Sequence, residues 1–239
     1  MTIHANNDLG RYEDFLEGLL ENGYRFVFFE DDLQSERQII LRHDIDFDPR
    51  FALEMARIEA EKGVVASYFF LMRSELYNAF SASNIESIMA IKELGHRISL
   101  HFDPVIYQDF QRGFKQEVAL FQQQFDVRIR IVSIHRPNDF FQQYDRPIMG
   151  IEHTYQSRYF RKIKYFADSR GEWRYGHPFD SEEFKQGKTL QILIHPIWWM
   201  MSGENKHEKL RRYFHKCVDA LKTEFNNNCI PFREIYESL

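Results

Sequence analysis

The chain has 239 residues, with 31 Lys and Arg against 36 Asp and Glu, so its formal net charge is −5, and 44% of its residues are hydrophobic. This composition is typical of a globular protein, and the length fits one α/β barrel domain of roughly 200–250 residues. Basic residues are scattered among acids instead of forming a stripe, which argues against sequence-independent nucleic-acid binding.

The cysteine content, the N-terminal residues and the apolar runs are relevant to the cellular location of the protein. Cys217 and Cys229 are the two cysteines, too few for a disulfide scaffold or a zinc ribbon. The N-terminus has no basic region followed by an apolar stretch, and no apolar run of about 18 residues occurs. We therefore expect a cytoplasmic protein without a membrane span. The oligomeric state does not follow from these features.

Strand-like apolar runs alternate with helical spacings along the chain. We expect, in order, a helix at 9–22, a strand at 39–41, a helix at 50–61, a strand at 64–72, a helix at 84–94, a strand at 97–101, a helix at 107–125, strands at 129–134, 163–167 and 190–194, and a long amphipathic helix at 204–225. Asp48 precedes Pro49 and is expected to cap the second helix. The alternation predicts a mostly parallel sheet, open or closed into a barrel.

Domain organisation follows from the absence of any low-complexity linker. We predict one domain over 1–239, with a lead-in at 1–38 and a C-terminal helical segment at 204–239.

Polar residues gather where the predicted strands end. They are Asp44, Asp46, His101, Asp103, His135, Asp168 and His195. Successive spacings from Asp46 through His101, His135 and Asp168 to His195 are 55, 34, 33 and 27 residues. A βαβ unit takes roughly 30 residues, so these positions should reach one edge of the sheet, the functional face of parallel α/β folds.

The residue types at this edge suggest a metal and acid–base chemistry. An Asp/His/His set with an open position suits zinc or a similar divalent ion, and a second carboxylate and histidine can move protons. Asp44 and Asp46 are separated by one residue and point to the same side of an extended chain, so their repulsion calls for a cation or a proton.

Five motifs resemble those of the NodB-homology polysaccharide deacetylases, carbohydrate esterase family 4. In order they are Leu41-Arg-His-Asp-Ile-Asp46, Gly95-His-Arg-Ile-Ser-Leu-His101, His135-Arg-Pro137, Asp168-Ser169 and Leu193-Ile-His-Pro196. The resemblance spans about residues 39–199 and is closest to a divergent branch with His-Asp-x-Asp and Leu-His-Phe-Asp motifs. It implies a distorted (β/α) barrel with about seven strands and a divalent metal, usually zinc, bound by one Asp and two His.

The resemblance also implies roles. Asp44 matches the catalytic base, Asp46 the metal-binding Asp displaced by one residue, and His101 the first metal-binding His. His195 matches the acid that protonates the leaving amine, and Asp168 the acid that orients a partner.

The departures from the family pattern concern the second metal-binding His. Its usual position is Val105 here, and His135 stands where the third motif usually has Arg. We expect His135 to replace the lost ligand, with Asp103 as the competitor and a metal-free site also open. Arg136 is expected to bind a substrate carboxylate or phosphate, or to pair with Asp168.

Three tryptophans follow the site motifs. Trp173, Trp198 and Trp199 could stack on sugar rings, or could belong to core packing.

The resemblance, together with the residue types at the strand ends, implies a metal-dependent hydrolase that removes an N-acyl group, such as acetyl, from an amino sugar of a glycan or a glycan precursor. Two alternatives remain open: a hydrolase of another amide or a cyclic ureide on the same fold, and a non-catalytic sugar-binding pseudoenzyme.

Overall fold

The protein is described here by a computed structural model that covers residues 9–236, apart from the side chain of Phe140. The chain divides into two compact units, residues 1–200 and 201–239, which are described separately. The expectation of one domain over 1–239 stays a prediction.

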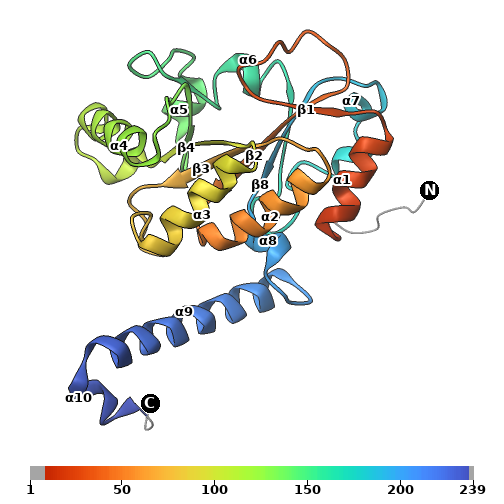
Figure 1. The fold of residues 1–239 in the computed structure, drawn as a ribbon. Helices are drawn as coiled ribbons and strands as arrows, with labels where there is room; N and C mark the ends of the chain where they lie inside the picture. Colours follow the sequence, from red (N-terminus) through yellow and green to blue (C-terminus); the bar gives the residue numbers. More distant parts are fainter. Residues whose placement is uncertain (1–8, 237–239) are drawn as a thin grey trace. The chain divides into compact units, whose positions relative to one another are not determined.

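A parallel sheet forms the centre of the larger unit (Figure 1). Its strands are β1 (Arg25–Val27), β2 (Gln38–Ile45), β3 (Ser67–Leu71), β4 (Arg97–Phe102), β5 (Ile131–Ile134), β6 (Glu152–His153), β7 (Lys164–Ala167) and β8 (Leu190–Ile194). Seven strands follow the order β6-β5-β4-β3-β2-β8-β7, β1 pairs with β2, and all these pairs are parallel. The predicted distorted barrel of about seven strands is confirmed as a curled, half-barrel sheet.

Helices follow most strands, as the alternating pattern predicted. They are α1 (Tyr12–Glu21), α2 (Pro49–Glu61), α3 (Ala82–Glu93), α4 (Phe110–Phe125) and the short α5 (Asp139–Gln143), α6 (Ser157–Phe160), α7 (Glu182–Lys185) and α8 (Ile197–Met200). Asp48 caps α2, as expected, because its carboxylate accepts a hydrogen bond from the Arg50 backbone N–H at 3.0 Å. Between the strands expected at 129–134 and 163–167, for which the sequence predicted no further element, the structure contains β6 and α6.

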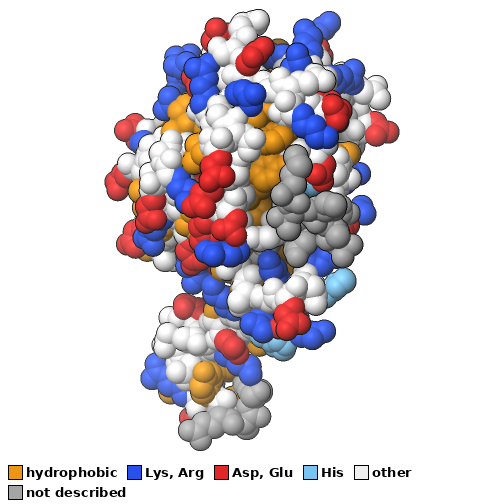
Figure 2. Space-filling view, turned by 90° about the vertical axis from the view of Figure 1, so that its right-hand side faces the viewer, with side chains coloured by type: hydrophobic (Ala, Val, Ile, Leu, Met, Phe, Trp, Pro, Cys, Tyr) orange, Lys and Arg blue, Asp and Glu red, His pale blue; other side chains and the backbone are white. Residues whose placement is uncertain are grey.

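The core lies on both faces of the central strands. Every residue of β2 and β3 is buried, as expected for strands covered on both sides. Phe29, Ile40, Phe69 and Tyr159 belong to one buried cluster, which accounts for part of the aromatic content. The rigid central strands carry the polar residues at their carboxyl ends. Figure 2 shows acidic and basic side chains interspersed over the visible face of this unit.

The smaller unit contains α9 (Lys206–Asn228) and α10 (Ile230–Arg233). None of the helices within residues 9–236 is both long and apolar enough to cross a lipid bilayer.

Candidate metal centre

The carboxyl ends of five strands supply the predicted site residues. Asp46 follows β2 directly, His101 lies near the end of β4, and His135, Asp168 and His195 directly follow β5, β7 and β8. Because these strands are parallel, their carboxyl ends share one edge of the sheet.

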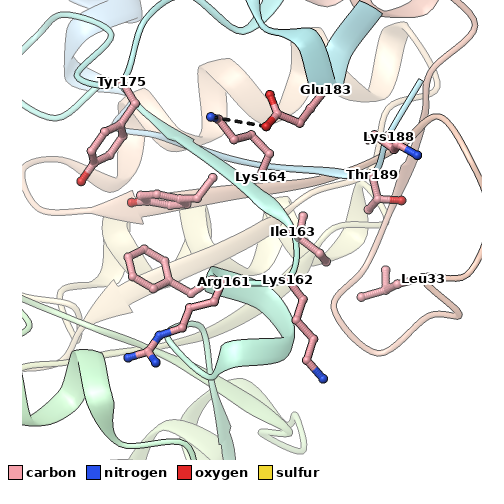
Figure 3. A pocket seen from close by; sticks show the side chains of 11 residues that line it. Leu33, Arg161, Lys162, Ile163, Lys164, Tyr175, Glu183, Lys188 and Thr189 are labelled. Atoms are coloured by element: carbon pink, nitrogen blue, oxygen red, sulfur yellow. Dashed lines mark ion pairs between the residues drawn. The ribbon is translucent and has the colours of Figure 1, made fainter. Parts of the chain in front are cut away.

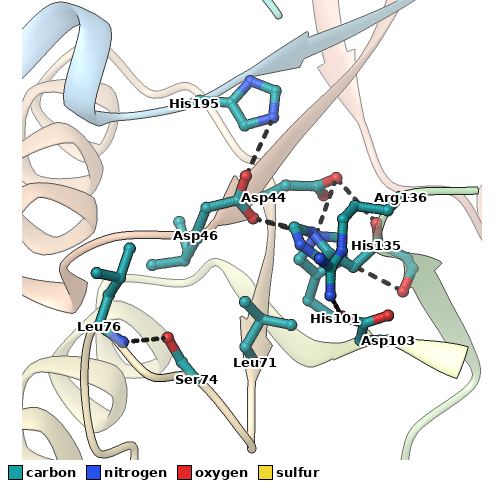
Figure 4. Close-up of polar contacts among 12 residues, drawn as sticks. Asp44, Asp46, Leu71, Ser74, Leu76, His101, Asp103, His135, Arg136 and His195 are labelled. Atoms are coloured by element: carbon teal, nitrogen blue, oxygen red, sulfur yellow. Dashed lines mark hydrogen bonds and ion pairs between the residues drawn. The ribbon is translucent and has the colours of Figure 1, made fainter. Parts of the chain in front are cut away.

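Asp46, His101 and His135 form the one group of candidate metal ligands found among the described residues. The Oδ1 atom of Asp46 lies 3.2 Å from His101 Nε2 and 3.4 Å from His135 Nδ1. The two imidazole nitrogens are 3.0 Å apart (Figure 4). The two residues that the sequence placed 34 positions apart thus present nitrogen atoms to the same carboxylate oxygen.

The donor set fits a divalent ion. Zinc binds oxygen and imidazole nitrogen at about 2.0–2.1 Å, and tetrahedral ligands at that distance are about 3.3 Å from one another. The three separations around Asp46, His101 and His135 scatter about this value. On the far side of its ring, His101 Nδ1 lies 3.3 Å from the carbonyl oxygen of Ser133. In the tautomer that donates from Nδ1 to this carbonyl oxygen, Nε2 has a lone pair that can bind a metal.

The electrostatics of Asp46 also favour a cation. Burial opposes the charged carboxylate, but the neighbouring imidazoles of His101 and His135 hold its pKa well below the usual range. Asp46 is therefore ionised at neutral pH, in a site where two further carboxylates, Asp44 and Asp168, lie nearby. Zinc accepts this mixed nitrogen and oxygen set, and three protein ligands leave a fourth position for water or substrate.

Asp44 is held by a residue that the sequence reasoning missed. Arg42, on the same strand, donates from Nε to Asp44 Oδ1 at 2.9 Å and from Nη2 to Oδ2 at 2.6 Å. Ser133 Oγ donates to the same Oδ2 at 3.0 Å, and His101 Nε2 lies 3.7 Å from it. Arg42 is fully buried. Burial raises the pKa of Asp44, but Arg42 together with His101 and His195 outweighs burial and holds this pKa below its usual value.

The one sequence signal for Arg42 is its position. It is a charged residue that directly follows the apolar run Ile39–Leu41 within a buried strand, and it stands two residues before Asp44, on the same side of the strand.

His195 is oriented by Asp168 and faces the metal ligands. Its Nδ1 atom donates to Asp168 Oδ1 at 2.6 Å, and its Nε2 atom lies 3.8 Å from Asp46 Oδ2. Burial disfavours the imidazolium, but the carboxylates of Asp168, Asp46 and Asp44 outweigh burial and raise the pKa of His195 to about 9. Trp199 Nε1 donates to the other oxygen of Asp168 at 2.8 Å. His195 is therefore positioned as a proton donor beside the candidate metal centre.

Arg136 does not pair with Asp168, so that alternative is wrong. It forms an ion pair with Asp103, its side chain is 60% exposed, and its φ of 47° turns the chain directly after His135. Asp103 also caps the short 3₁₀ helix Pro104–Ile106 by accepting from the Val105 backbone N–H at 3.2 Å. The carboxylate of Asp103 is thus engaged elsewhere, and the geometry favours His135 over Asp103 as the third ligand. The side chain of Arg136 is still largely exposed, and the binding of an anionic substrate group by Arg136 stays a prediction.

The tryptophans lie mostly in the core. Trp173 is 1% exposed and packs against Phe15 and His177, with ring centroids 5.3 and 5.7 Å away. Trp198 is 7% exposed. Burial removes both from the expected role of stacking on a sugar. Trp199 is half-buried and is better described as a positioning residue for Asp168.

A groove of about 560 Å³ lies away from these residues, along β7 (Figure 3). Lys164, Tyr175 and Lys188 are among the side chains that line it, and Lys164 Nζ lies 3.6 Å from a carboxylate oxygen of Glu183. None of the predicted site residues lines this groove.

The fold and the site together define a parallel α/β protein with an Asp-His-His candidate metal centre at the carboxyl edge of its sheet. No family model and no curated protein matches the chain.

Solved structures do resemble its fold. A family 4 carbohydrate esterase from Bacillus anthracis is 16% identical, over 90% of each chain, with a TM-score of 0.44. A peptidoglycan N-acetylglucosamine deacetylase is 14% identical, over 86% of this chain and 90% of that one, with a TM-score of 0.47. A pseudoenzyme of carbohydrate esterase family 4 from Bacillus anthracis is 10% identical, over 78% of this chain and 62% of that one, with a TM-score of 0.41.

Proposed function

We propose that the protein is a metal-dependent amide hydrolase that removes an N-acyl group, in the first place acetyl, from an amino sugar. The observation that carries this proposal is the triangle of Asp46, His101 and His135, flanked by a held carboxylate, Asp44, and by a histidine, His195. Amide hydrolysis needs an electrophilic centre, a base and an acid at one place, and this edge of the sheet supplies residues for each role.

The triad residues would hold a divalent ion, with zinc as the first candidate. When bound, such an ion supplies Lewis-acid polarisation of a carbonyl and lowers the pKa of a water molecule. Arg42 keeps Asp44 ionised and fixed, so its carboxylate is ready to accept a proton from the attacking water. His195, oriented by Asp168, presents Nε2 toward the triad and can deliver a proton to the leaving nitrogen.

The amino-sugar substrate rests on the sequence motifs rather than on the geometry alone. The site itself requires an amide whose carbonyl reaches the triad while its nitrogen faces His195. An N-acetylated sugar meets this requirement, and the five motifs resemble those of enzymes that act on such sugars. Arg136, exposed beside His135, suits an acidic or phosphorylated form of the sugar.

Release of acetate from a chitin oligosaccharide and from a nucleotide-linked N-acetyl amino sugar tests the proposal. We expect zinc-loaded protein to release acetate from at least one of them. Asp44→Asn should bind zinc and release none, while Asp14→Asn, on the exposed side of α1, should behave as wild type. Ring opening of a cyclic ureide without acetate release would identify the other hydrolase. Zinc binding without either reaction would favour the pseudoenzyme.

A further inference from the structure

Hydrogen bonds hold only part of the Arg42 guanidinium. Its Nε and Nη2 atoms donate to Asp44, and Nη2 also donates to Ser133 Oγ at 2.6 Å. Within residues 9–236 no atom accepts a hydrogen bond from Nη1, although the side chain is fully buried. A long buried cation that is bonded along one edge keeps its orientation only if another group contacts the rest of it.

The ring of Tyr155 makes such a contact. The Cζ atom of Arg42 lies over this ring, 5.1 Å from its centroid. Tyr155 is 8% exposed, and the attraction between a cation and an aromatic face is strongest where water is excluded. Burial raises the pKa of the Tyr155 hydroxyl, although Arg42 acts in the opposite direction. The phenol is therefore neutral, and the contact is not an ion pair.

The backbone around Tyr155 is anchored on two sides. Tyr155 follows β6 in a turn where the His153 N–H donates to Gln156 Oε1 at 3.0 Å and the Gln156 N–H donates to the His153 carbonyl oxygen at 3.1 Å. The Thr154 N–H donates to the carbonyl oxygen of Val132, on β5, at 3.0 Å. The turn is thus bonded to itself and to the neighbouring strand, which gives the ring of Tyr155 a fixed position.

We propose that Tyr155 is a positioning residue that holds the Arg42 guanidinium in the orientation that pairs with Asp44. With the ring in place, the guanidinium cannot turn away from the carboxylate without leaving the aromatic face. A residue outside the five site motifs thus sets the geometry of the proposed base. The step from Arg42 to turnover rests on the proposed function, in which Asp44 accepts the proton of the attacking water.

A double-mutant cycle in urea unfolding of the full chain tests the contact itself. We expect Tyr155→Leu and Arg42→Met to be coupled by roughly thirtyfold in the unfolding equilibrium constant, as for a desolvated cation over a ring. The matched control is the exposed pair of Tyr175 and Arg174, whose Cζ atom lies 5.4 Å from the Tyr175 ring centroid. Tyr175→Leu and Arg174→Met should be coupled by at most about fivefold.

Two ring substitutions separate the attraction between charge and ring from the filling of space. Tyr155→Phe keeps the aromatic face, so it should keep most of the coupling to Arg42. Pentafluorophenylalanine at position 155 has a similar shape but an electron-poor face, so it should lose most of the coupling. Because both rings fill the interior, these two proteins test the inference even if Tyr155→Leu does not fold.

Steady-state kinetics on an N-acetylated amino sugar tests the positioning of the base. Tyr155→Leu should lower kcat at least about tenfold and leave KM within about twofold, because Tyr155 acts through Arg42 and not on the substrate. Tyr155→Phe should restore kcat to within about threefold of wild type. In the Arg42→Met background, Tyr155→Leu should change the remaining kcat by less than about twofold.

Three results would overturn the inference. One is a coupling between Tyr155 and Arg42 no larger than that of the exposed control pair. Another is equal coupling for phenylalanine and pentafluorophenylalanine at position 155. The third is an equal fall in kcat on Tyr155→Leu with and without Arg42. A wild-type protein that releases no acetate would instead count against the proposed function, and the unfolding cycle would still decide whether Tyr155 holds Arg42.

Discussion

His195 and Asp168 form a short hydrogen-bonded ion pair at the carboxyl edge of the sheet. Nδ1 of His195 donates to Oδ1 of Asp168 at 2.6 Å, and the Asp168 carboxylate is fully buried. The backbone N–H of His195 also donates to this carboxylate, at 3.0 Å to Oδ2. One carboxylate thus fixes both the ring and the main chain of His195, and directs Nε2 toward the candidate metal centre.

The first prediction concerns this contact. Asp168→Asn keeps the shape of the side chain but removes the charge that stabilises the imidazolium, so kcat should fall by at least about a hundredfold. Bound zinc should be unchanged, because Asp168 is not in the triad. Steady-state kinetics and elemental analysis of the same preparation check both statements. Loss of zinc together with activity would mean that Asp168 supports the metal and not His195.

Arg42 should be required for both stability and activity. Arg42→Met leaves the buried Asp44 carboxylate without its bidentate partner and should lower the free energy of unfolding by about 3 kcal/mol. Arg42→Lys should recover little, because one ammonium group cannot reproduce two parallel hydrogen bonds. Arg57→Met, on the exposed side of α2, is the control and should stay within about 0.5 kcal/mol of wild type. Urea unfolding measures these differences, and a stable Arg42→Met variant with normal turnover would contradict the role assigned to Arg42.

Glu59 anchors a buried polar cluster on the helix side of β2. Its carboxylate lies 2.7 Å from His43 Nε2 and accepts hydrogen bonds from the hydroxyls of Tyr68, at 2.7 Å, and Tyr12. Glu59→Ala leaves these groups buried without their acceptor and should lower the free energy of unfolding by about 3 kcal/mol or more. Glu54→Ala, exposed on the same helix, should cost less than about 0.5 kcal/mol. Equal effects of the two substitutions in thermal unfolding would show that the cluster contributes nothing specific.

Glu117 gives a prediction for pH. Burial raises the pKa of Glu117 from 4.5 to about 7, although its partners Tyr107 and Arg73 act in the opposite direction. The folded state therefore binds this proton more tightly than the unfolded state does. The stabilisation is fully present below pH 4.5 and is lost as the pH rises through 7, at a cost of about 3 kcal/mol.

Glu117→Gln should flatten this dependence, so that wild type loses more stability than the variant between pH 4.5 and 7. Denaturant unfolding across that range, with exposed Glu86→Gln as the control, makes the comparison. Parallel pH profiles for wild type and Glu117→Gln would show that Glu117 is ionised in the folded protein throughout.

The sequence predicted the strands and their polar ends better than the contacts around them. Apolar runs such as Leu190–Ile194 are buried on both faces and match their predicted bounds. The strand expected at 39–41 instead continues to Ile45, because Arg42, His43 and Asp44 find buried partners. Ser133, which contacts both Arg42 and Asp44, comes from a strand about 90 residues further along, and such pairings leave no local pattern.

The roles of neighbouring side chains were harder to predict for a similar reason. Arg136 follows His135 directly, yet a left-handed turn directs its side chain to Asp103 and away from Asp168. Trp173 lies in a loop after Asp168 but is buried by α1, an element that no motif connects to it. Motif order indicated the site, whereas the burial of each ring depended on tertiary packing.

Zinc stoichiometry across four single variants tests the central claim most directly. We expect one equivalent of zinc in wild type and in Asp103→Ala, and the same in His207→Ala, whose exposed histidine lies on α9. His101→Ala and His135→Ala should each lose the metal, because each removes one of the three converging donors. Retention of zinc by His135→Ala together with its loss from Asp103→Ala, or the absence of zinc from folded wild-type protein, would contradict the assignment of Asp46, His101 and His135 as a metal centre.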